Sequence, residues 1–279
     1  MLRIWLTGSA LLSAFSILLV LGFLVHSSWP LVQQQGFRFI TEPEWYPYEA
    51  LYGLAPALLG SIWSVLLALL IAIPTGLAAA ITSAELLPKQ LRVTVRFSME
   101  LMAGIPSVVY GLIGLWILLP LLESQLELIT GRSLLAAGLL LAMMILPTIM
   151  VFSEDALRAV SREQREAAMN LGLDWPTLLR RVLLPQAWSG IRVAILLSLG
   201  RAMGETVAVM LVVGSLDRLP DPLYNLLQPA QTLTSRIGRE MAEASLASLH
   251  WAALIACGLV LALITITVSI MAQFTRRTQ

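Results

Sequence analysis

Six long apolar blocks constrain this chain more than any other feature of its sequence. They cover approximately Ile4–Val25, Leu54–Thr82, Phe97–Leu122, Ser133–Phe152, Ile191–Leu216 and Trp251–Phe274. Each block reaches the roughly 20 residues that an α-helix needs to cross about 30 Å of hydrocarbon. Only 13% of the residues are charged and 58% are hydrophobic, whereas an average soluble domain is about a quarter charged. The sequence therefore predicts an all-α polytopic membrane protein with six transmembrane helices, and it excludes a soluble enzyme.

The first block follows Arg3 and has the position of a signal peptide. Its apolar run is longer than the roughly 7–15 residues of a typical signal-peptide core, and no small-x-small cleavage site precedes Ser27. We therefore expect a retained first helix, with a cleaved signal peptide as the alternative.

Basic residues between the blocks set the expected orientation, because cytoplasmic loops carry an excess of Lys and Arg. With the N-terminus inside, most of the 18 basic residues fall on the cytoplasmic side: Arg3, Lys89, Arg92, Arg96, Arg158, Arg162, Arg165, Arg180, Arg181, Arg192, Arg276 and Arg277. The other side holds Arg38, Arg132, Arg218, Arg236 and Arg239, and Arg201 lies inside a block. Both termini are predicted to be cytoplasmic. The formal net charge of +1 gives no sign of a nucleic-acid partner.

The chain divides into residues 1–53, which hold the first helix and an aromatic-rich outer segment, and residues 54–279, which form the transmembrane core. The aromatic residues of Ser27–Gly53 are typical of anchoring at the membrane interface, and a binding surface is the alternative. Asp217–His250 also lies outside. Its second half, Thr232–Leu249, has helical character and is expected to lie on the membrane or to dip into it.

The charged loop 153–190 is too long for a simple connection. Glu163–Leu171 suits a short amphipathic helix, and Gly172 is a suitable stop for it. Asp174 and Pro176 are typical of the start of a second helix. The pattern predicts a helix–turn–helix knob that projects from the membrane, and a solvated loop is the alternative.

The same loop carries a spaced motif that resembles the cytoplasmic signature of ABC-importer permeases. The motif falls on Glu166, Ala167, Ala168, Gly172, Val182, Leu184 and Pro185, with valine where that family more often has isoleucine. The resemblance implies that the short helix before Gly172 docks in a groove of an ATPase subunit and transmits its closure.

Three further segments resemble permeases of phosphate ABC importers, of the PstC type: Glu100–Leu112, Leu199–Val209 and Leu233–Ile237. This resemblance implies the ABC-importer permease fold, a bacterial inner-membrane location, a second homologous permease and two ATPase subunits that hold ATP and Mg. It also implies an extracytoplasmic phosphate-binding protein. The preference for phosphate over sulfate, molybdate or another oxyanion rests on the resemblance alone.

Arg201 and Glu205 lie within the fifth block and, four residues apart, are expected to share a helix face. A charge at the bilayer centre costs about 2.5–3.5 kcal/mol on insertion scales, so both should face protein or water. They either line the translocation pathway or neutralise each other. A guanidinium suits a phosphate oxyanion because it donates two parallel hydrogen bonds, and a low-affinity waypoint is expected because conduction requires release.

Glycine and proline mark two more candidate features. Gly200 and Gly204 form a Gly-x-x-x-Gly spacing, which favours close helix packing. Pro74, Pro106 and Pro147 interrupt the second, third and fourth blocks. The stretch at Pro106, beside Ser107 and Tyr110, is either a broken segment that lines the pathway or a simple kink.

Enzymatic chemistry finds no support in the sequence. There is no phosphate-binding loop for ATP, and His26 and His250 stand alone, without the spacing of a metal site. We expect no enzyme activity, metal or cofactor in this chain. A secondary anion transporter is the competing class, but it should show two half-chains of matching hydropathy, and none is evident.

Overall fold

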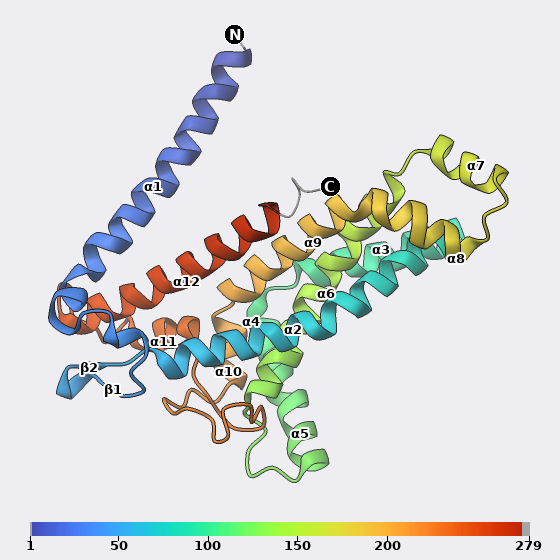
Figure 1. The fold of residues 1–279 in the computed structure, drawn as a ribbon. Coiled ribbons are helices and arrows are strands. Elements are labelled where there is room, and N and C mark those ends of the chain that lie inside the picture. Colours follow the sequence, from blue (N-terminus) through green and yellow to red (C-terminus); the bar gives the residue numbers. More distant parts are fainter. Residues whose placement is uncertain (1, 275–279) are drawn as a thin grey trace.

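The computed structural model describes residues 2–274, with side chains described for residues 5–271 (Figure 1). The side chains of Arg3, Arg276 and Arg277, which enter the orientation argument, lie outside that part. The α-helices are α1 (Leu2–Gln35), α2 (Ala55–Ile81), α3 (Lys89–Gly104), α4 (Ser107–Ile113), α5 (Leu119–Leu126), α6 (Leu134–Arg158), α7 (Arg162–Asn170), α8 (Trp175–Leu178), α9 (Leu184–Gly204), α10 (Val207–Val212), α11 (Leu233–Glu240) and α12 (Leu249–Phe274). Three π-helical turns, η3 (Thr82–Leu86), η4 (Gly114–Leu118) and η5 (Leu179–Leu183), extend or join them.

Six helical segments of the described chain are long and apolar enough to cross a membrane, so the predicted all-α, six-span architecture is confirmed. They are Trp5–Gln35, Ala55–Leu86, Ser107–Leu126, Leu134–Arg158, Trp175–Gly204 and Leu249–Met271. α1 runs ten residues past the predicted Val25 and includes Pro30. α2 and α6 continue through Pro74 and Pro147, so only Pro106 of the three candidate prolines interrupts a helix.

The prediction of one continuous third span, Phe97–Leu122, is wrong. α3 ends at Gly104, Ile105 and Pro106 are extended, and a new helix starts at Ser107. The apolar segment that can cross the membrane is therefore Ser107–Leu126. The physical cause is Pro106, whose ring disfavours helical backbone at the preceding residue.

The prediction for the fifth span, Ile191–Leu216, is also wrong at both ends. The helix begins at Trp175, because α8, η5 and α9 follow one another without interruption to Gly204. It then breaks, since Glu205 has an extended backbone (φ −71°, ψ 122°) and α10 starts at Val207.

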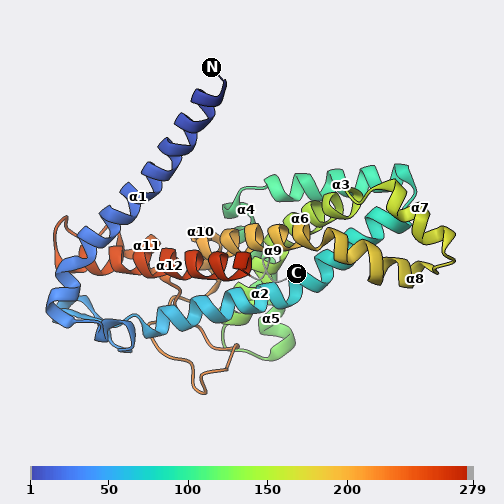
Figure 2. The same ribbon diagram turned by 45° about the horizontal axis from the view of Figure 1, so that its top comes forward.

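The bundle is built around α6, which packs against α2 and α9. Figures 1 and 2 show α7 and α8 at one end of the bundle and the small β-hairpin at the other, and we call these the α7 end and the hairpin end. α1 diverges from the body, and it contacts α12.

The segments at the hairpin end are packed into the bundle. β1 (Trp45–Tyr46) pairs antiparallel with β2 (Leu51–Tyr52); the 3₁₀ turn η1 (Arg38–Ile40) precedes the hairpin, and the 3₁₀ turn η2 (Pro47–Glu49) connects its two strands. Trp45 and Tyr52 join a hydrophobic cluster with α12, whereas Tyr48 is fully exposed, so interface anchoring describes only part of the aromatic set. Within Thr232–Leu249 the helix is α11, and it packs among α2, α10 and α12.

Candidate functional site

The ends of two broken helices meet through Arg201. α3 stops at Gly104 and α9 stops at Gly204, and the guanidinium of Arg201 donates from both terminal nitrogens to the carbonyl oxygen of Ala103, at 3.2 and 3.1 Å. The last carbonyls of a helix have no partner within it and carry the negative end of its dipole, so a guanidinium is a suitable cap. Arg201 therefore ties the two interruptions together.

Glu205 does not share a helix face with Arg201, contrary to the sequence prediction, because it follows the last residue of α9. Its carboxylate accepts a hydrogen bond from the backbone N–H of Ala208 at 3.2 Å, within the first turn of α10. Among the described residues, no ion pair joins Glu205 to Arg201. The structure thus does not bring them together as a self-neutralising pair.

The two other candidate pathway residues take different positions at the first break. Ser107 is the first residue of α4 and is partly exposed. Tyr110 is buried, and its hydroxyl donates to the carbonyl oxygen of Met102 at 2.9 Å, so it caps the end of α3.

Both breaks border open space within this chain. A Cβ placed on Gly104, Gly200 or Gly204 would meet no other described atom within 4 Å. The Gly200–Gly204 spacing therefore does not serve packing inside this chain. It leaves a smooth helix face beside Arg201 that is open to lipid, water or another chain.

At the α7 end, the loop forms the predicted helix–turn–helix knob. The hydroxyl of Ser161 caps α7 by accepting from the N–H of Gln164 at 3.4 Å. α7 ends at Asn170, Gly172 has a left-handed backbone (φ +76°), and α8 starts after Asp174. A left-handed residue after a helix is the usual reason for glycine at that position.

The motif residues of the knob split between an anchored face and an exposed face. Ala168 is buried, whereas Glu166 and Ala167 are exposed. Two apolar side chains beside them, Met169 and Leu171, are 58% and 81% exposed. Apart from the ion pair of Glu166 with Arg162 of the same helix, this face is not covered by the rest of the described chain.

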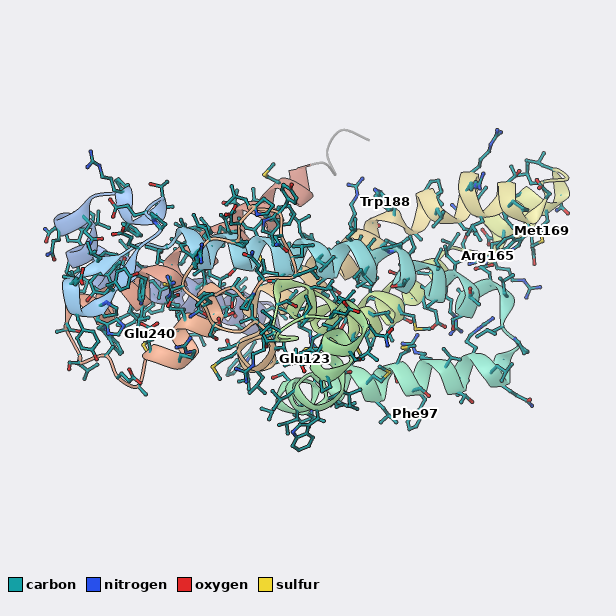
Figure 3. All side chains as sticks on the ribbon, turned by 90° about the horizontal axis from the view of Figure 1, so that it is seen from below. Phe97, Glu123, Arg165, Met169, Trp188 and Glu240 are labelled. Atoms are coloured by element: carbon teal, nitrogen blue, oxygen red, sulfur yellow. The ribbon has the colours of Figure 1, made fainter. Side chains whose placement is uncertain are left out.

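Arg165 fastens α7 to the rest of the bundle. Its Nη1 lies 2.8 Å from each carboxylate oxygen of Glu85 in η3, and its Nη2 donates to the carbonyl of Leu157 in α6 at 2.7 Å. Both side chains are largely buried, at 21% and 10% exposure. Figure 3 labels Arg165 and Met169 together at the α7 end, far from Glu240. The two residues are 80 positions apart, so no local pattern in the sequence predicts this contact.

The continuous helix Trp175–Gly204 connects the knob to Arg201. Thirty residues at 1.5 Å each span about 45 Å. The motif residues Leu184 and Pro185 lie at the start of α9, directly after the π-helical turn η5. They therefore form part of the connecting helix and not of the knob itself.

A second group of ion pairs joins α3 to α6 at the α7 end. Arg96 binds Glu100 at 2.8 Å and both carboxylate oxygens of Asp155 at 2.5 and 3.1 Å. The bond to Asp155 raises the pKa of Arg96 above its ordinary range. Glu154 is fully buried; its Oε2 lies 4.0 Å from Nη1 of Arg96, and its Oε1 lies 3.8 Å from Nη1 of Arg158. These ion pairs hold α3 and α6 together at the α7 end.

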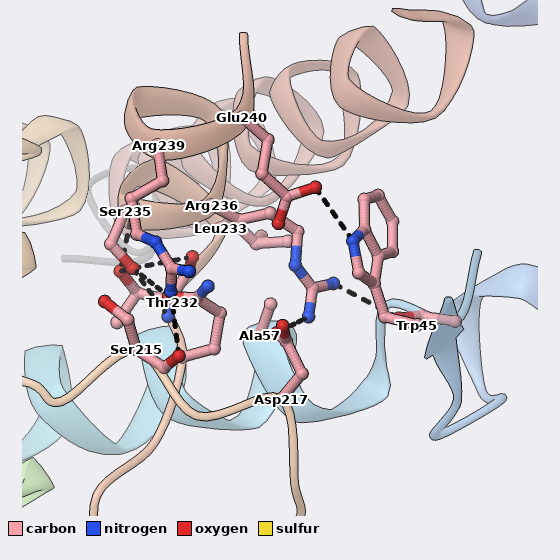
Figure 4. Close-up of polar contacts among 12 residues, drawn as sticks. Trp45, Ala57, Ser215, Asp217, Thr232, Leu233, Ser235, Arg236, Arg239 and Glu240 are labelled. Atoms are coloured by element: carbon pink, nitrogen blue, oxygen red, sulfur yellow. Dashed lines mark hydrogen bonds and ion pairs between the residues drawn. The ribbon is translucent and has the colours of Figure 1, made fainter. Parts of the chain in front are cut away.

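At the hairpin end, Arg236 forms a buried polar cluster that the sequence analysis missed. Its side chain is fully buried and forms an ion pair with Asp217 (Figure 4). It also donates to the carbonyl of Gly53 at 3.2 Å and lies 4.0 Å from the centre of the Trp45 ring.

The same cluster extends to α12 through Glu240. The carboxylate of Glu240 accepts from Nε1 of Trp45 at 2.9 Å and lies 2.9 Å from Nε2 of His250. Burial raises the pKa of Tyr52, and the nearby negative charge of Glu240 adds to that effect. Hence His250 is not isolated, as the sequence suggested. The sequence offered one signal of this cluster, since Arg236 and Glu240 lie four residues apart in a short amphipathic helix. Their partners are too distant in the sequence to be inferred from it.

Comparison with known proteins places the fold in a family. Residues 72–279 match the family described as binding-protein-dependent transport system inner membrane component. The chain belongs to this family. It is also 33% identical to the phosphate transport system permease protein PstC of Mesorhizobium japonicum, over 94% of this chain and 86% of that protein. Identity to the protein of the same name from Pasteurella multocida is 35%, over 89% and 82% of the two chains.

Solved structures support the same fold at low sequence identity. A chain of a bacterial ABC transporter involved in the import of the acidic polysaccharide alginate matches with a TM-score of 0.61 and 17% identity, over 99% of this chain and 97% of that one. A chain of the inward-facing MetNI methionine ABC transporter matches with a TM-score of 0.60 and 18% identity, over 84% and 98%. The family member described here therefore has the ABC-transporter permease fold.

The residues that the structure describes include no group of three or more His, Cys, Asp or Glu side chains placed to hold a metal ion. The chemistry of the site consists instead of a guanidinium, a carboxylate and backbone groups freed at two helix breaks. Of these groups, the guanidinium can bind and orient an anion, whereas the carboxylate repels one.

Proposed function

We propose that this chain is a membrane-spanning permease subunit of an ATP-driven phosphate importer. The observation that carries the proposal is the 33% identity to a phosphate transport system permease over 94% of the chain. The alternative is import of another oxyanion, such as sulfate or molybdate. A secondary anion transporter is a weaker alternative, because the knob at the α7 end presents an unpartnered face suited to a separate motor protein.

The proposed complex contains a second homologous permease, two ATPase subunits that bind ATP and Mg, and an extracytoplasmic phosphate-binding protein. The exposed Met169 and Leu171, beside Glu166 and Ala167, support docking of an ATPase, because exposed apolar groups in a charged loop mark protein contacts. Pairing with the second permease is supported by the open helix faces at Gly104 and Gly204. The basic residues of the α7 end support a cytoplasmic location for that end and for both termini, in a bacterial inner membrane.

Arg201 is proposed to meet the ion at the two helix breaks. A guanidinium can direct two parallel N–H groups at a phosphate oxyanion, and here both terminal nitrogens hold the carbonyl of Ala103. The ion and the carbonyl therefore compete for the same donors. This competition keeps the ion site weak, as release requires, and Glu205 adds a nearby negative charge. Ser107 lies at the break between α3 and α4, and the Tyr110 hydroxyl caps the end of α3 at that break.

Coupling is proposed to run along the helix Trp175–Gly204. Closure of the ATPase subunits would displace α7, whose Ala168 and Arg165 are held by the bundle. Gly172 fixes the angle between α7 and α8, and Leu184 and Pro185 lie where α8 and η5 pass into α9. Movement of the knob thus reaches Arg201 through one continuous helix.

The test is uptake of radiolabelled phosphate at low concentration, in cells that lack the chain and in cells with the chain restored. Excess unlabelled sulfate or molybdate serves as the competitor. We expect restored uptake that neither competitor suppresses. Uptake that does not depend on the chain would overturn the phosphate assignment, and uptake suppressed by sulfate would point to the alternative oxyanion.

A further inference from the structure

α11 is a short helix with an unusually well-fixed position. Thr232 and Ser235 form a reciprocal cap at its start, and the backbone N–H of Leu233 donates to the hydroxyl of Ser61 in α2 at 2.9 Å. A Cβ on Gly60 would lie 1.9 Å from the carbonyl oxygen of Gln231, so α2 and the start of α11 are in backbone contact. α11 cannot shift without moving α2.

One side of α11 touches the break between α9 and α10. The hydroxyl of Thr234 donates to the carbonyl oxygen of Glu205 at 2.8 Å. One turn further along, a Cβ on Gly238 would lie 2.8 Å from Cγ2 of Thr206. Thus both residues of the break, Glu205 and Thr206, lie directly against α11.

The other side of α11 is clamped to the hairpin end through Arg236 and Glu240. Arg236 pairs with Asp217 and packs against the face of the Trp45 ring, and Glu240 accepts from Nε1 of Trp45 (Figure 4). A buried charge that loses its partner is costly, so this clamp resists rotation of α11 about its axis. The break therefore rests on a fixed surface.

We propose that Thr234 is a positioning residue for the translocation site, and that its hydroxyl sets the orientation of the Glu205 peptide group. This inference rests on the proposed function of Arg201 and Glu205. Without the hydroxyl, the Glu205 carbonyl loses its donor and the peptide group can turn, which displaces the Glu205 carboxylate and the start of α10. Small displacements of a positioned group can lower the rate strongly, since a misplacement of about 1 Å can reduce it roughly a hundredfold.

Thr234→Val and Thr234→Ser form a matched pair for the test, because valine keeps the shape of threonine and serine keeps its hydroxyl. With equal amounts of complex in the membrane, we expect Thr234→Val to lower the maximal rate of phosphate uptake roughly tenfold and Thr234→Ser to retain most of it. Equal uptake by the valine variant and the unaltered chain would overturn the proposal. So would an equal loss in both variants.

Thiol labelling provides a second measurement, which reports the geometry of the break between α9 and α10 without any transport of the ion. Thr206→Cys is introduced with Cys257→Ala, which removes the one native thiol, and membranes are treated with a water-soluble maleimide. Thr234→Val should change the labelling rate of the Thr206→Cys thiol, whereas Thr234→Ser should not. An unchanged labelling rate would contradict the positioning role. If the unaltered chain failed to support phosphate uptake, the proposed function would fall, yet the labelling experiment would still test the contact.

Gly238→Ala provides a further variant in case Thr234→Val does not assemble. It retains the hydroxyl but presses a methyl group against Thr206, so uptake should fall at a normal amount of complex. Normal uptake by Gly238→Ala would overturn the claim that α11 sets the break.

Discussion

Arg165 holds Glu85 across 80 residues of sequence, with one guanidinium nitrogen 2.8 Å from both carboxylate oxygens. The other terminal nitrogen binds the carbonyl of Leu157. A single side chain of α7 therefore joins the end of α2 and the end of α6. In the proposed importer, force on α7 would reach both helices through this contact as well as through α8 and α9.

Charge reversal at this pair tests the contact. Arg165→Glu and Glu85→Arg should each lower phosphate uptake while ATP hydrolysis persists, because either change sets two like charges against each other in a partly buried contact and removes the hydrogen bonds of the pair, at a cost of at least about 1–3 kcal/mol. The double variant should recover much of the uptake. Uptake and ATPase activity are measured on matched amounts of complex, and a double variant no better than the singles would contradict the role of the pair.

Gly172→Val should uncouple ATP hydrolysis from transport without preventing membrane insertion. A Cβ at this position would meet no atom within 4 Å, so the difficulty is the left-handed backbone. That conformation costs an ordinary residue roughly 1–2 kcal/mol, and β-branched residues tolerate it poorly. Gly172→Asn is the matched control, since asparagine adopts this conformation more readily. The measured quantity is ATP hydrolysed per phosphate imported; loss of the whole complex from the membrane would instead make Gly172 a folding residue.

Substitutions at Arg201 and Glu205 test the ion site. Arg201→Lys keeps the charge but loses the two-pronged donor, and we expect uptake to fall about tenfold, equivalent to about 1.4 kcal/mol. Glu205→Gln can still accept from Ala208, so any change in uptake reports the charge alone. Arg180→Lys, at an exposed position on the same continuous helix, is the control. Unchanged transport in both test variants, at normal amounts of complex, would exclude a pathway role.

Arg236→Met should destabilise the complex strongly. Removing one partner of a buried ion pair typically costs about 3–5 kcal/mol, because the remaining charge is left uncompensated. Adding Asp217→Asn to this variant should restore part of the stability. Arg239→Met on the same helix removes an exposed arginine and should change stability by only about 0.5 kcal/mol or less. Thermal unfolding of the solubilised complex measures the difference, and equal shifts for Arg236 and Arg239 would refute the clamp.

Sequence patterns predicted the features that depend on local chemistry. Long apolar blocks gave the six-span, all-α class, and the glycine and Asp174–Pro176 signals gave the knob, because helix ends are set by neighbouring residues. Hydropathy failed where an apolar run contains a change of backbone direction. Pro106 offered a signal for one such break, but the break at Glu205 and Thr206 lies against Thr234 and Gly238 of α11, which no local pattern connects to it.

The polar contacts at the two ends of the bundle could not be predicted either, because they join residues that are far apart in the sequence. Glu85 has a lysine four residues later, a spacing that favours a local ion pair, yet its partner is Arg165. Arg236 stood in a polar outer segment and gave no sign of complete burial. Both depend on helices that come together only in the folded bundle.

The π-helical turn η5 has a consequence for length variation in this chain. A π turn contains one residue more than an α turn, and η5 lies between the knob and Arg201. Deleting one residue within Leu179–Leu183 would convert this π turn into an α turn, so the helix before it and the helix after it would keep nearly the same angular relation. The same deletion inside α9 would instead turn the knob by about 100° relative to Arg201, so η5 is the segment of this helix where a change of one residue in length should be tolerated.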